Sequence, residues 1–307
     1  MSRSDVPKVA IAPDPDVAWM VEAVTDGGGE IAAVEDADAI VWLDANDPEG
    51  LASAVRRAPD ARWIQLPFAG VESFLPFLER QRTWTCGKGV YADPVAELAF
   101  ALGLAGLRGF GSYARARTWT PSAGRSLVGG RVTILGGGGI AESLIRMLAP
   151  FDCHVTVVRS TVDHMDGVDV VLEADRYADA LPGADLVVLA LPLTDETVGI
   201  IGAGELEIME SHAWLVNVAR GQHVVTDDLV AALSDGVIGG AGLDVTDPEP
   251  LPDDHPLWSL GNCVITPHTG ATPEMWKPLL AERVRTNVRR FGAGQPLVGL
   301  VDLDAGY

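Results

Sequence analysis

The chain has 307 residues, of which 48% are hydrophobic, and this is enough to bury two hydrophobic cores rather than three. Its 22 basic and 43 acidic residues give a formal charge of −21. This charge argues against nucleic acid as a partner, because phosphates require clustered Lys and Arg. A site for an anionic cofactor or substrate must therefore be locally positive.

Cysteine usage and the N-terminus bear on the compartment. The cysteines Cys86, Cys153 and Cys263 are widely spaced and odd in number, so they predict neither a disulfide framework nor a metal site. We therefore expect a reducing cytoplasm. Residues 1–8 are polar and no apolar run approaches membrane length, so we expect neither secretion nor membrane insertion.

Strands and helices alternate along the first third of the chain. The pattern predicts a strand at 8–12, a helix at 17–24, a strand at 38–43, a helix at 48–57 and a strand at 62–66. Such alternation is typical of a parallel sheet covered by helices. A long helix is then expected from Pro94 to about Leu107, with proline in its first turn.

The alternation continues through a second block. It predicts strands at 132–135, 154–158, 185–190, 213–217, 240–243 and 263–266, and helices at 140–148 and 278–290. The fold class is therefore expected to be α/β, with two doubly wound parallel-sheet domains. One domain would comprise residues 1–92 and 274–307, and the other residues 93–273.

The turn after the strand at 132–135 is a run of four glycines followed by an apolar helix. Gly136 and Gly138 occupy the first two positions of a dinucleotide fingerprint, and Ala141 stands where a third glycine often stands. The first glycine permits the turn, the second lets backbone approach a pyrophosphate, and the third position must be small for packing. The pyrophosphate would sit on the helix N-terminus. A merely flexible turn is the alternative.

The next strand ends at the position that contacts the ribose. An enzyme that uses NAD usually has Asp or Glu there, about 20 residues beyond the glycines. This chain has Arg159, followed by Ser160 and Thr161, and a guanidinium with two hydroxyls suits a 2′-phosphate. These residues favour NADP. In the alternative, Arg159 is an exposed loop residue and Asp163 or Asp166 contacts the ribose.

Three later segments place polar residues at the carboxyl ends of strands, where open α/β sheets bind ligands. They carry Arg220, Glu249 and His268. Singly, each has an ordinary explanation: Arg220 could cap a strand, Glu249 could be a solvated loop carboxylate, and His268 could hydrogen-bond within a turn. Their occurrence in this order after a dinucleotide fingerprint favours a catalytic set.

Seven ordered segments resemble the D-isomer-specific 2-hydroxyacid dehydrogenase family. They are Leu-Pro-Phe-Ala-Gly-Val-Glu (66–72), Gly-Val-Tyr-Ala-Asp-Pro-Val-Ala-Glu (89–97), the fingerprint, Leu-Pro-Leu-Thr-Asp-Glu-Thr (191–197), Asn-Val-Ala-Arg-Gly (217–221), Leu-Asp-Val-Thr-Asp-Pro-Glu-Pro-Leu (243–251) and Thr-Pro-His (266–268). The match runs from about Arg62 to the end of the chain. It implies a Rossmann cofactor domain and a flavodoxin-like substrate domain.

The resemblance also implies roles for individual residues. His268 would protonate the carbonyl oxygen of a 2-oxo acid during reduction, and Glu249 would orient its ring. Arg220 would hold the substrate carboxylate and polarise the carbonyl. The amides of Ala69 and Gly70 would hold the same carboxylate from the other domain, so closure on the substrate is expected.

The cofactor contacts are expected in the second block. The residues are Gly136, Gly138, Gly139, Ile140, Arg159, Ser160, Pro192, Thr197, Ala219 and Asp244. The resemblance makes Asp244 the acid that binds the nicotinamide carboxamide. The cofactor would be NADP in preference to NAD.

The short first block and Arg159-Ser160 resemble the glyoxylate/hydroxypyruvate reductase branch, which favours a small anionic 2-oxo or 2-hydroxy acid as substrate. As in relatives, the long helix from Pro94 is expected to pack a homodimer, although its apolar side could instead be intramolecular core. Two other interpretations stay open. One is a corepressor-like protein that senses the cofactor with little turnover. The other is an enzyme related to alanine dehydrogenase or homocysteine hydrolase.

Overall fold

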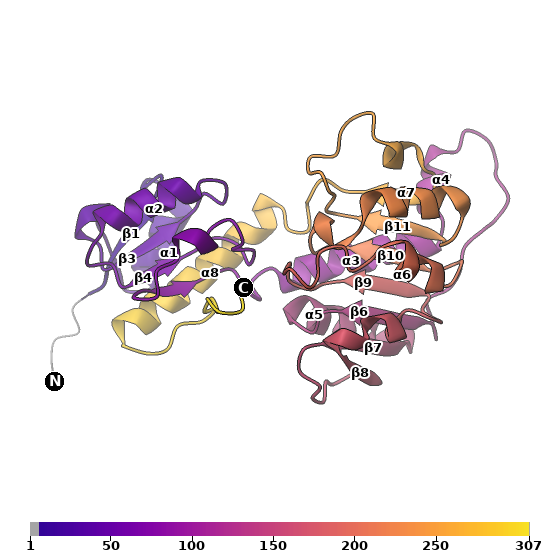
Figure 1. Cartoon of the computed structure of the whole chain (residues 1–307). Helices are drawn as coiled ribbons and strands as arrows, with labels where there is room; N and C mark the ends of the chain where they lie inside the picture. The colour runs from indigo at the N-terminus through magenta and orange to yellow at the C-terminus, as the bar shows by residue number, and fades with distance from the viewer. Residues whose placement is uncertain (1–5, 307) are drawn as a thin grey trace. The chain divides into compact units, whose positions relative to one another are not determined.

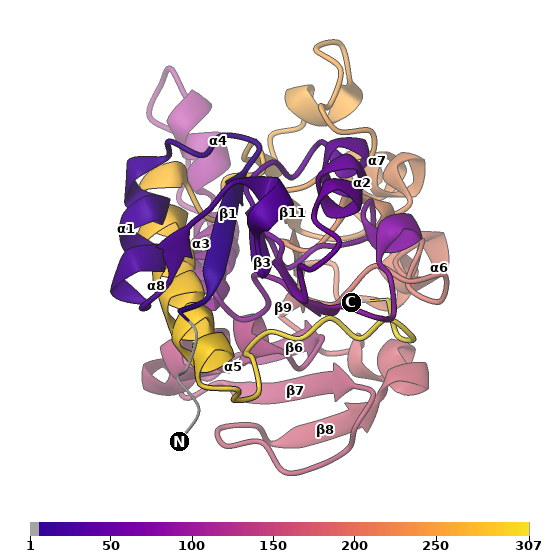
Figure 2. The same cartoon turned by 90° about the vertical axis from the view of Figure 1, so that its left-hand side faces the viewer.

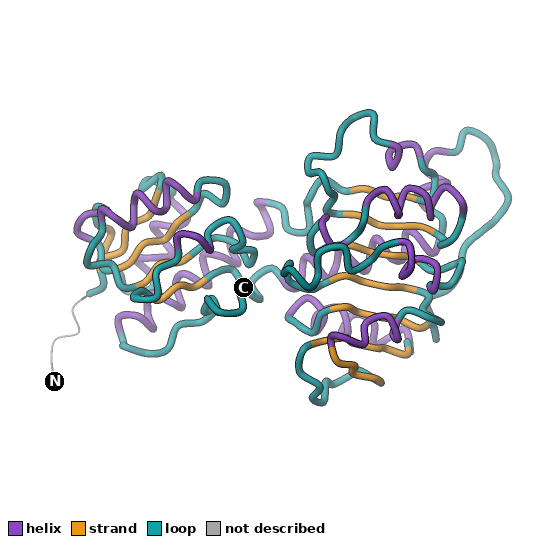
Figure 3. Tube along the Cα trace, in the orientation of Figure 1, coloured by secondary structure: helices purple, strands orange, loops and turns teal. Residues whose placement is uncertain are grey.

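The computed structural model describes residues 6–306 and contains two compact units (Figures 1 and 3). Unit 1 comprises residues 1–91 and 271–307, and unit 2 comprises residues 92–270. The sequence pattern predicted changes of domain after residues 92 and 273.

Unit 1 is a five-stranded sheet with helices on both faces. Its elements are β1 (Lys8–Ala12), α1 (Ala18–Asp26), β2 (Glu30–Ile31), β3 (Ala39–Trp42), α2 (Pro48–Arg57), β4 (Trp63–Gln65), β5 (Thr83–Thr85) and α8 (Pro273–Gly292). The strand order is β2-β1-β3-β4-β5, and every pair is parallel. This order is the flavodoxin-like one.

Successive residues along the strands of unit 1 point to opposite faces of the sheet, so they pack into two separate hydrophobic cores. Val9 and Ile11 of β1 face α1 and α8, where they pack with Val284 of α8. Ile40 and Trp42 of β3 face the opposite side, in the cluster that contains the apolar residues of α2. Figure 2 shows α1 and α8 on one side of β1 and β3, with α2 on the other. Both faces are covered, as a parallel sheet requires.

Unit 2 is a seven-stranded sheet. Its elements are α3 (Ala92–Leu107), α4 (Phe110–Arg115), β6 (Arg131–Leu135), α5 (Gly139–Leu148), β7 (His154–Arg159), β8 (Val170–Glu173), β9 (Leu186–Leu189), α6 (Ala203–Ile208), β10 (Trp214–Asn217), α7 (Thr226–Asp235), β11 (Gly240–Leu243) and β12 (Cys263–Ile265). The order is β12-β11-β10-β9-β6-β7-β8, all parallel. Counted from β6, the strands run 3-2-1-4-5-6-7, which extends the Rossmann order by one strand.

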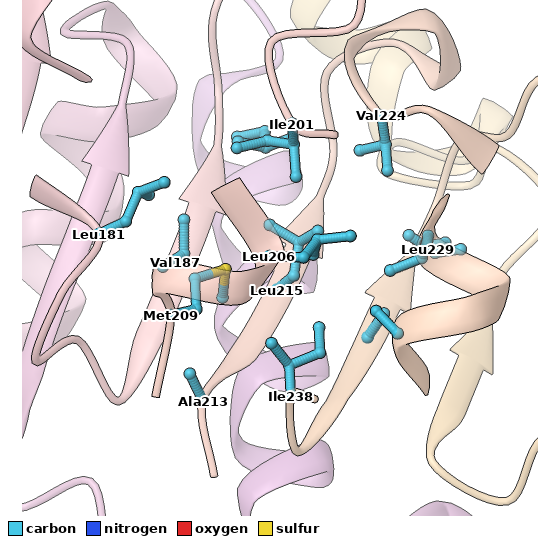
Figure 4. Packing of buried hydrophobic residues seen from close by; sticks show 14 of the residues in the cluster. Leu181, Val187, Ile201, Leu206, Met209, Ala213, Leu215, Val224, Leu229 and Ile238 are labelled. Atoms are coloured by element: carbon cyan, nitrogen blue, oxygen red, sulfur yellow. The ribbon is translucent and has the colours of Figure 1, made fainter. Parts of the chain in front are cut away.

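Two cores flank the sheet of unit 2. One contains the apolar faces of α3 and α5. The other contains α6 and α7, and Figure 4 shows Val187 and Leu215 of the sheet with Leu206 of α6 and Leu229 of α7. The helices on both faces confirm the doubly wound fold class that the sequence predicts.

The C-terminal helix is longer than expected. We predicted it from Pro278, but α8 begins at Pro273 and contains Pro278 in its interior. Pro273 is tolerated in the first turn, because its missing amide would have no intrahelical partner. Beyond Pro278, burial of Leu280 and Val284 against unit 1 keeps the helix continuous.

One side of α3 lies in the intramolecular core. Ala96, Ala99 and Leu102 are buried in the cluster that also contains α5 and the strands of unit 2. Gly106 lies against the Trp214 ring, since a Cβ there would be 2.1 Å from its Cε3 atom. In the part of the chain that the structure describes, no helix has the length and apolarity needed to cross a membrane.

Candidate active site

The carboxyl ends of the strands in unit 2 carry the site residues that the sequence predicts for it. The glycine turn follows β6, Arg159 ends β7, and the 191–197 segment follows β9. Arg220 and His268 lie in the loops that follow β10 and β12. Since all the strands are parallel, these loops share one edge of the sheet, and the order reverses between β6 and β9. Open α/β sheets bind ligands at such a switch point.

The glycine turn fits a dinucleotide. Gly136 has φ of +110°, and a Cβ there would lie 2.2 Å from the Ala190 oxygen, so only glycine is accommodated. Gly138 is exposed at the N-cap of α5 with open space where a Cβ would stand, and no side chain caps it. Ala141 is fully buried where the helix packs. The N-terminal amides of α5, including those of Gly139 and Ile140, thus suit a pyrophosphate.

Arg159 pairs with Asp163, which the sequence offered as an alternative contact for the ribose. Its Nη1 lies 3.1 Å from Asp163 Oδ1. Its aliphatic stem lies over the turn, because a Cβ on Gly137 would be 2.7 Å from Arg159 Cδ. Ser160 is exposed beside it. The guanidinium is therefore positioned by packing, and one carboxylate already engages it.

The 191–197 segment is held by its own hydrogen bonds. The Thr197 hydroxyl donates to the Pro192 oxygen at 2.9 Å and accepts from the Thr194 amide at 2.8 Å. The buried His223 ring lies 3.0 Å from the Thr197 oxygen and 3.2 Å from the Leu191 oxygen. The ring thus lies between the two ends of the segment, and in its neutral form it donates to one of the two oxygens. His223 was not predicted from the sequence, where the available signal was a polar residue two positions after the Asn-Val-Ala-Arg-Gly motif.

Arg220 lies in a loop shaped by a buried asparagine. Asn217 accepts from the Ala219 amide at 3.0 Å and donates to the Arg220 oxygen at 2.8 Å. The half-buried Arg220 donates through Nη1 to the Ala219 oxygen at 2.7 Å. In the sequence, Asn217 is only part of the Asn-Val-Ala-Arg-Gly motif. In the structure, it fixes the backbone of two predicted site residues, Ala219 and Arg220.

Glu249 and His268 form the expected pair. His268 Nδ1 lies 2.6 Å from Glu249 Oε1, although the two residues are 19 positions apart. Both side chains are substantially exposed. Because an ionised carboxylate only accepts, Nδ1 carries the hydrogen and Nε2 is left for a ligand.

Asp244 supports the His268 loop. It is only 3% exposed, and its carboxylate accepts from the Thr266 hydroxyl at 2.6 Å, the Thr269 amide at 2.8 Å and the Gly270 amide at 2.9 Å. The main-chain oxygen of Asp244 also accepts from the His268 amide at 2.8 Å. A nicotinamide carboxamide would have to bind the Asp244 carboxylate at an acceptor position that these hydrogen bonds leave unused.

The predicted carboxylate-binding turn lies in unit 1, after β4. Among the described residues, none accepts a hydrogen bond from the Ala69 or Gly70 amide. The preceding backbone is fixed, since the Gly87 amide donates to the Phe68 oxygen at 3.0 Å and the Tyr91 hydroxyl to the Pro67 oxygen at 2.5 Å. Two amides on a fixed turn can bind an anion.

Arg283 of α8 holds the neighbouring 86–88 loop, a contact that was not predicted from the sequence. It donates 2.9 Å hydrogen bonds to the Cys86 and Lys88 oxygens. Burial lowers the pKa of its guanidinium, but an arginine stays charged in proteins. Gly299 leaves room for it, because a Cβ there would lie 2.2 Å from Arg283 Nη1. A cation thus holds the loop whose Gly87 amide donates to the Phe68 oxygen.

A small polar cavity lies at the opposite edge of the sheet in unit 2. It has a volume of about 140 Å³ and is lined by Arg131, His154 and Val170, which begin β6, β7 and β8. Ligand pockets usually measure at least about 300 Å³, so this cavity is too small for a dinucleotide. The site at the carboxyl edge is the better candidate.

Comparison with known proteins identifies this arrangement. The family model described as "D-isomer specific 2-hydroxyacid dehydrogenase, NAD binding domain" matches residues 99–270. The chain is 33% identical over 220 residues to a glyoxylate/hydroxypyruvate reductase A from Serratia proteamaculans, covering 70% of this chain and 69% of that protein.

Solved structures agree over nearly the whole chain. A D-isomer specific 2-hydroxyacid dehydrogenase from Xanthobacter autotrophicus in complex with NADPH and MES has a TM-score of 0.85 at 26% identity, covering 99% of this chain and all of that one. An NADPH-dependent glyoxylate/hydroxypyruvate reductase from Sinorhizobium meliloti in complex with NADP and sulfate has a TM-score of 0.81 at 26% identity, with the same coverage. The chain therefore belongs to the D-isomer-specific 2-hydroxyacid dehydrogenase family, and it is a nicotinamide-dependent oxidoreductase of 2-hydroxy acids.

Proposed function

We propose that this enzyme reduces a small 2-oxo acid of the glyoxylate or hydroxypyruvate type to the corresponding 2-hydroxy acid, with NADPH as preferred cofactor. The observation that carries the proposal is the 2.6 Å contact between His268 Nδ1 and Glu249 Oε1, at the sheet edge that also bears the glycine turn and Arg220. The names of the Serratia and Sinorhizobium relatives support the substrate class.

His268 is the proposed proton donor. With Nδ1 held by Glu249, Nε2–H donates to the carbonyl oxygen of the 2-oxo acid as negative charge develops there. In the oxidative direction, Nε2 takes the proton back. Glu249 acts by orienting the ring and fixing which nitrogen carries the hydrogen.

Arg220 is the proposed carboxylate ligand in unit 2. Its planar guanidinium matches a carboxylate, and its charge stabilises the developing oxyanion. In unit 1, we assign carboxylate binding to the amides of Ala69 and Gly70, for which the described residues offer no acceptor. A bound reduced nicotinamide would supply the hydride, and the chain would hold it at the switch point.

The preference for NADP rests on Arg159. A guanidinium binds a 2′-phosphate with charge-assisted hydrogen bonds, whereas a carboxylate at the same position would repel it. The structures from Xanthobacter and Sinorhizobium contain NADPH and NADP, which supports the same assignment.

A homodimer through unit 2 is also proposed. One side of α3 is used within the unit, whereas Leu98, Phe100 and Leu104 of the same helix are only partly buried. Beyond α3, the chain exposes Phe110 and Tyr113 of α4 and Trp119 of the loop that follows. Exposed aromatic residues in one region are typical of protein interfaces.

A spectrophotometric assay tests the proposed function. The purified chain is mixed with NADPH or NADH and a panel of 2-oxo acids, and oxidation of the cofactor is followed. We expect turnover with glyoxylate or hydroxypyruvate to be highest with NADPH. Cofactor binding without turnover on any member of the panel would favour a cofactor-sensing protein instead. Failure to bind either cofactor would contradict both interpretations.

A further inference from the structure

We propose that Asp163 tunes the choice between NADPH and NADH by competing with the cofactor for Arg159. The inference rests on the proposed function, because it assumes that the ribose end of the cofactor lies beside Arg159. It concerns a residue that the sequence analysis considered only as a substitute for Arg159. The structure instead pairs the two.

The pair is held from one side only. Arg159 ends β7, its stem lies over Gly137, and its side chain is 25% exposed. Asp163 lies four residues later in the following loop, and its side chain is 59% exposed. Arg159 is thus the packed member of the pair and Asp163 the exposed one. An exposed carboxylate can leave such a pair at small cost.

The two cofactors should respond to this pair in opposite ways. The 2′-phosphate of NADPH would bind the guanidinium whose Nη1 Asp163 engages, and it is repelled by the Asp163 charge. The 2′-hydroxyl of NADH is a donor that a carboxylate accepts. Asp163 therefore weakens the binding of NADPH and strengthens the binding of NADH. The ion pair allows both cofactors to bind, while Arg159 favours the one with the 2′-phosphate.

The same loop supplies a matched control. Asp166 is fully exposed and pairs with His164 at 3.0 Å rather than with Arg159. Asp163→Asn and Asp166→Asn each remove one negative charge from this loop. Only the first releases the guanidinium. General electrostatic attraction of the phosphate can thus be separated from release of Arg159.

The experiment measures dissociation constants of NADPH and NADH by calorimetry for the unmodified chain and both variants, without substrate. We expect Asp163→Asn to bind NADPH about three- to tenfold more tightly and NADH no more tightly, an effect that salt weakens. Asp166→Asn should change both constants less than about twofold. Equal gains in both variants, or an unchanged ratio in Asp163→Asn, would overturn the inference. If the unmodified chain binds neither cofactor, the proposed function itself fails.

Discussion

His268 adopts a backbone conformation that residues other than glycine seldom adopt, with φ of +50°. Asp244 keeps it there, because its main-chain oxygen accepts from the His268 amide and its carboxylate accepts from the two amides that follow. None of these bonds uses the imidazole. The ring is therefore free to serve Glu249 on one nitrogen and a ligand on the other, while the buried carboxylate fixes its point of attachment.

Removing the imidazole should remove the proton donor and little else. We expect His268→Ala to lower turnover on any accepted 2-oxo acid by about 10²- to 10⁴-fold, the usual scale for a positioned general acid. The cofactor dissociation constant should stay nearly unchanged. His164→Ala is the control, since His164 is exposed and also pairs with a carboxylate, Asp166. If His268→Ala keeps most of its turnover, the catalytic assignment is wrong.

Charge reversal at the end of β7 should change the cofactor. In Arg159→Asp, the guanidinium is replaced by a second carboxylate beside Asp163. Loss of a bidentate charge-assisted contact should weaken NADPH binding about ten- to a hundredfold. NADH binding should hold or improve, as fluorescence titration with both cofactors would show. Equal affinity of the unmodified chain for the two cofactors would refute the NADP assignment.

At the scale of elements, the sequence predicted what depends on local pattern. The alternation of β1, α1, β3 and α2 was visible, and so was the turn after β6, because buried strands and glycine turns leave short-range signals. The strands β2, β5 and β8 were missed. β2 is Glu-Ile and β5 is Thr-Trp-Thr, so neither contains the apolar run that marked β4, and β8 is a four-residue strand at the edge of its sheet.

Long-range contacts between polar residues were the other gap. The family resemblance pointed to Arg220, Glu249 and His268, but it could not show that Asn217 holds the Arg220 loop or that Arg283 reaches the Cys86 oxygen. Such contacts join residues whose types alone predict nothing. Arg283 and Cys86 are 197 positions apart.

The glycine turn and β7 should act together on the cofactor. A Cβ at position 137 would lie 2.7 Å from Arg159 Cδ and 3.0 Å from its Cβ, so Gly137→Ala must displace this side chain. We expect NADPH to bind about three- to tenfold more weakly, with NADH little affected, because one charge-assisted contact is misplaced. Gly204→Ala in α6 is the control, since its Cβ meets nothing within 4 Å. Equal weakening of both cofactors would show that the turn itself had been damaged.

At the scale of the whole molecule, we predict a homodimer. In α3, Ala99 and Leu102 are buried in the core shared with α5, whereas Leu98 and Leu104 are only partly buried. Among the exposed apolar side chains of unit 2 are those of α4 and the loop beyond it, where Trp119 is 101% exposed. An indole fully in water has the large apolar area that interfaces bury, which makes this loop the better place to disturb a dimer.

Light scattering can test that assembly directly. At micromolar concentration we expect a mass twice the 32.4 kDa of one chain. Trp119→Ala should shift the mass toward the monomer on dilution, because truncating a buried indole commonly costs an interface about 2 kcal/mol or more. Ile208→Ala is the control, since Ile208 is 43% exposed in the same unit but belongs to α6, which packs on the opposite face of the sheet from α3. A monomeric unmodified chain would exclude the dimer, and a dimer equally sensitive to both variants would place its interface elsewhere.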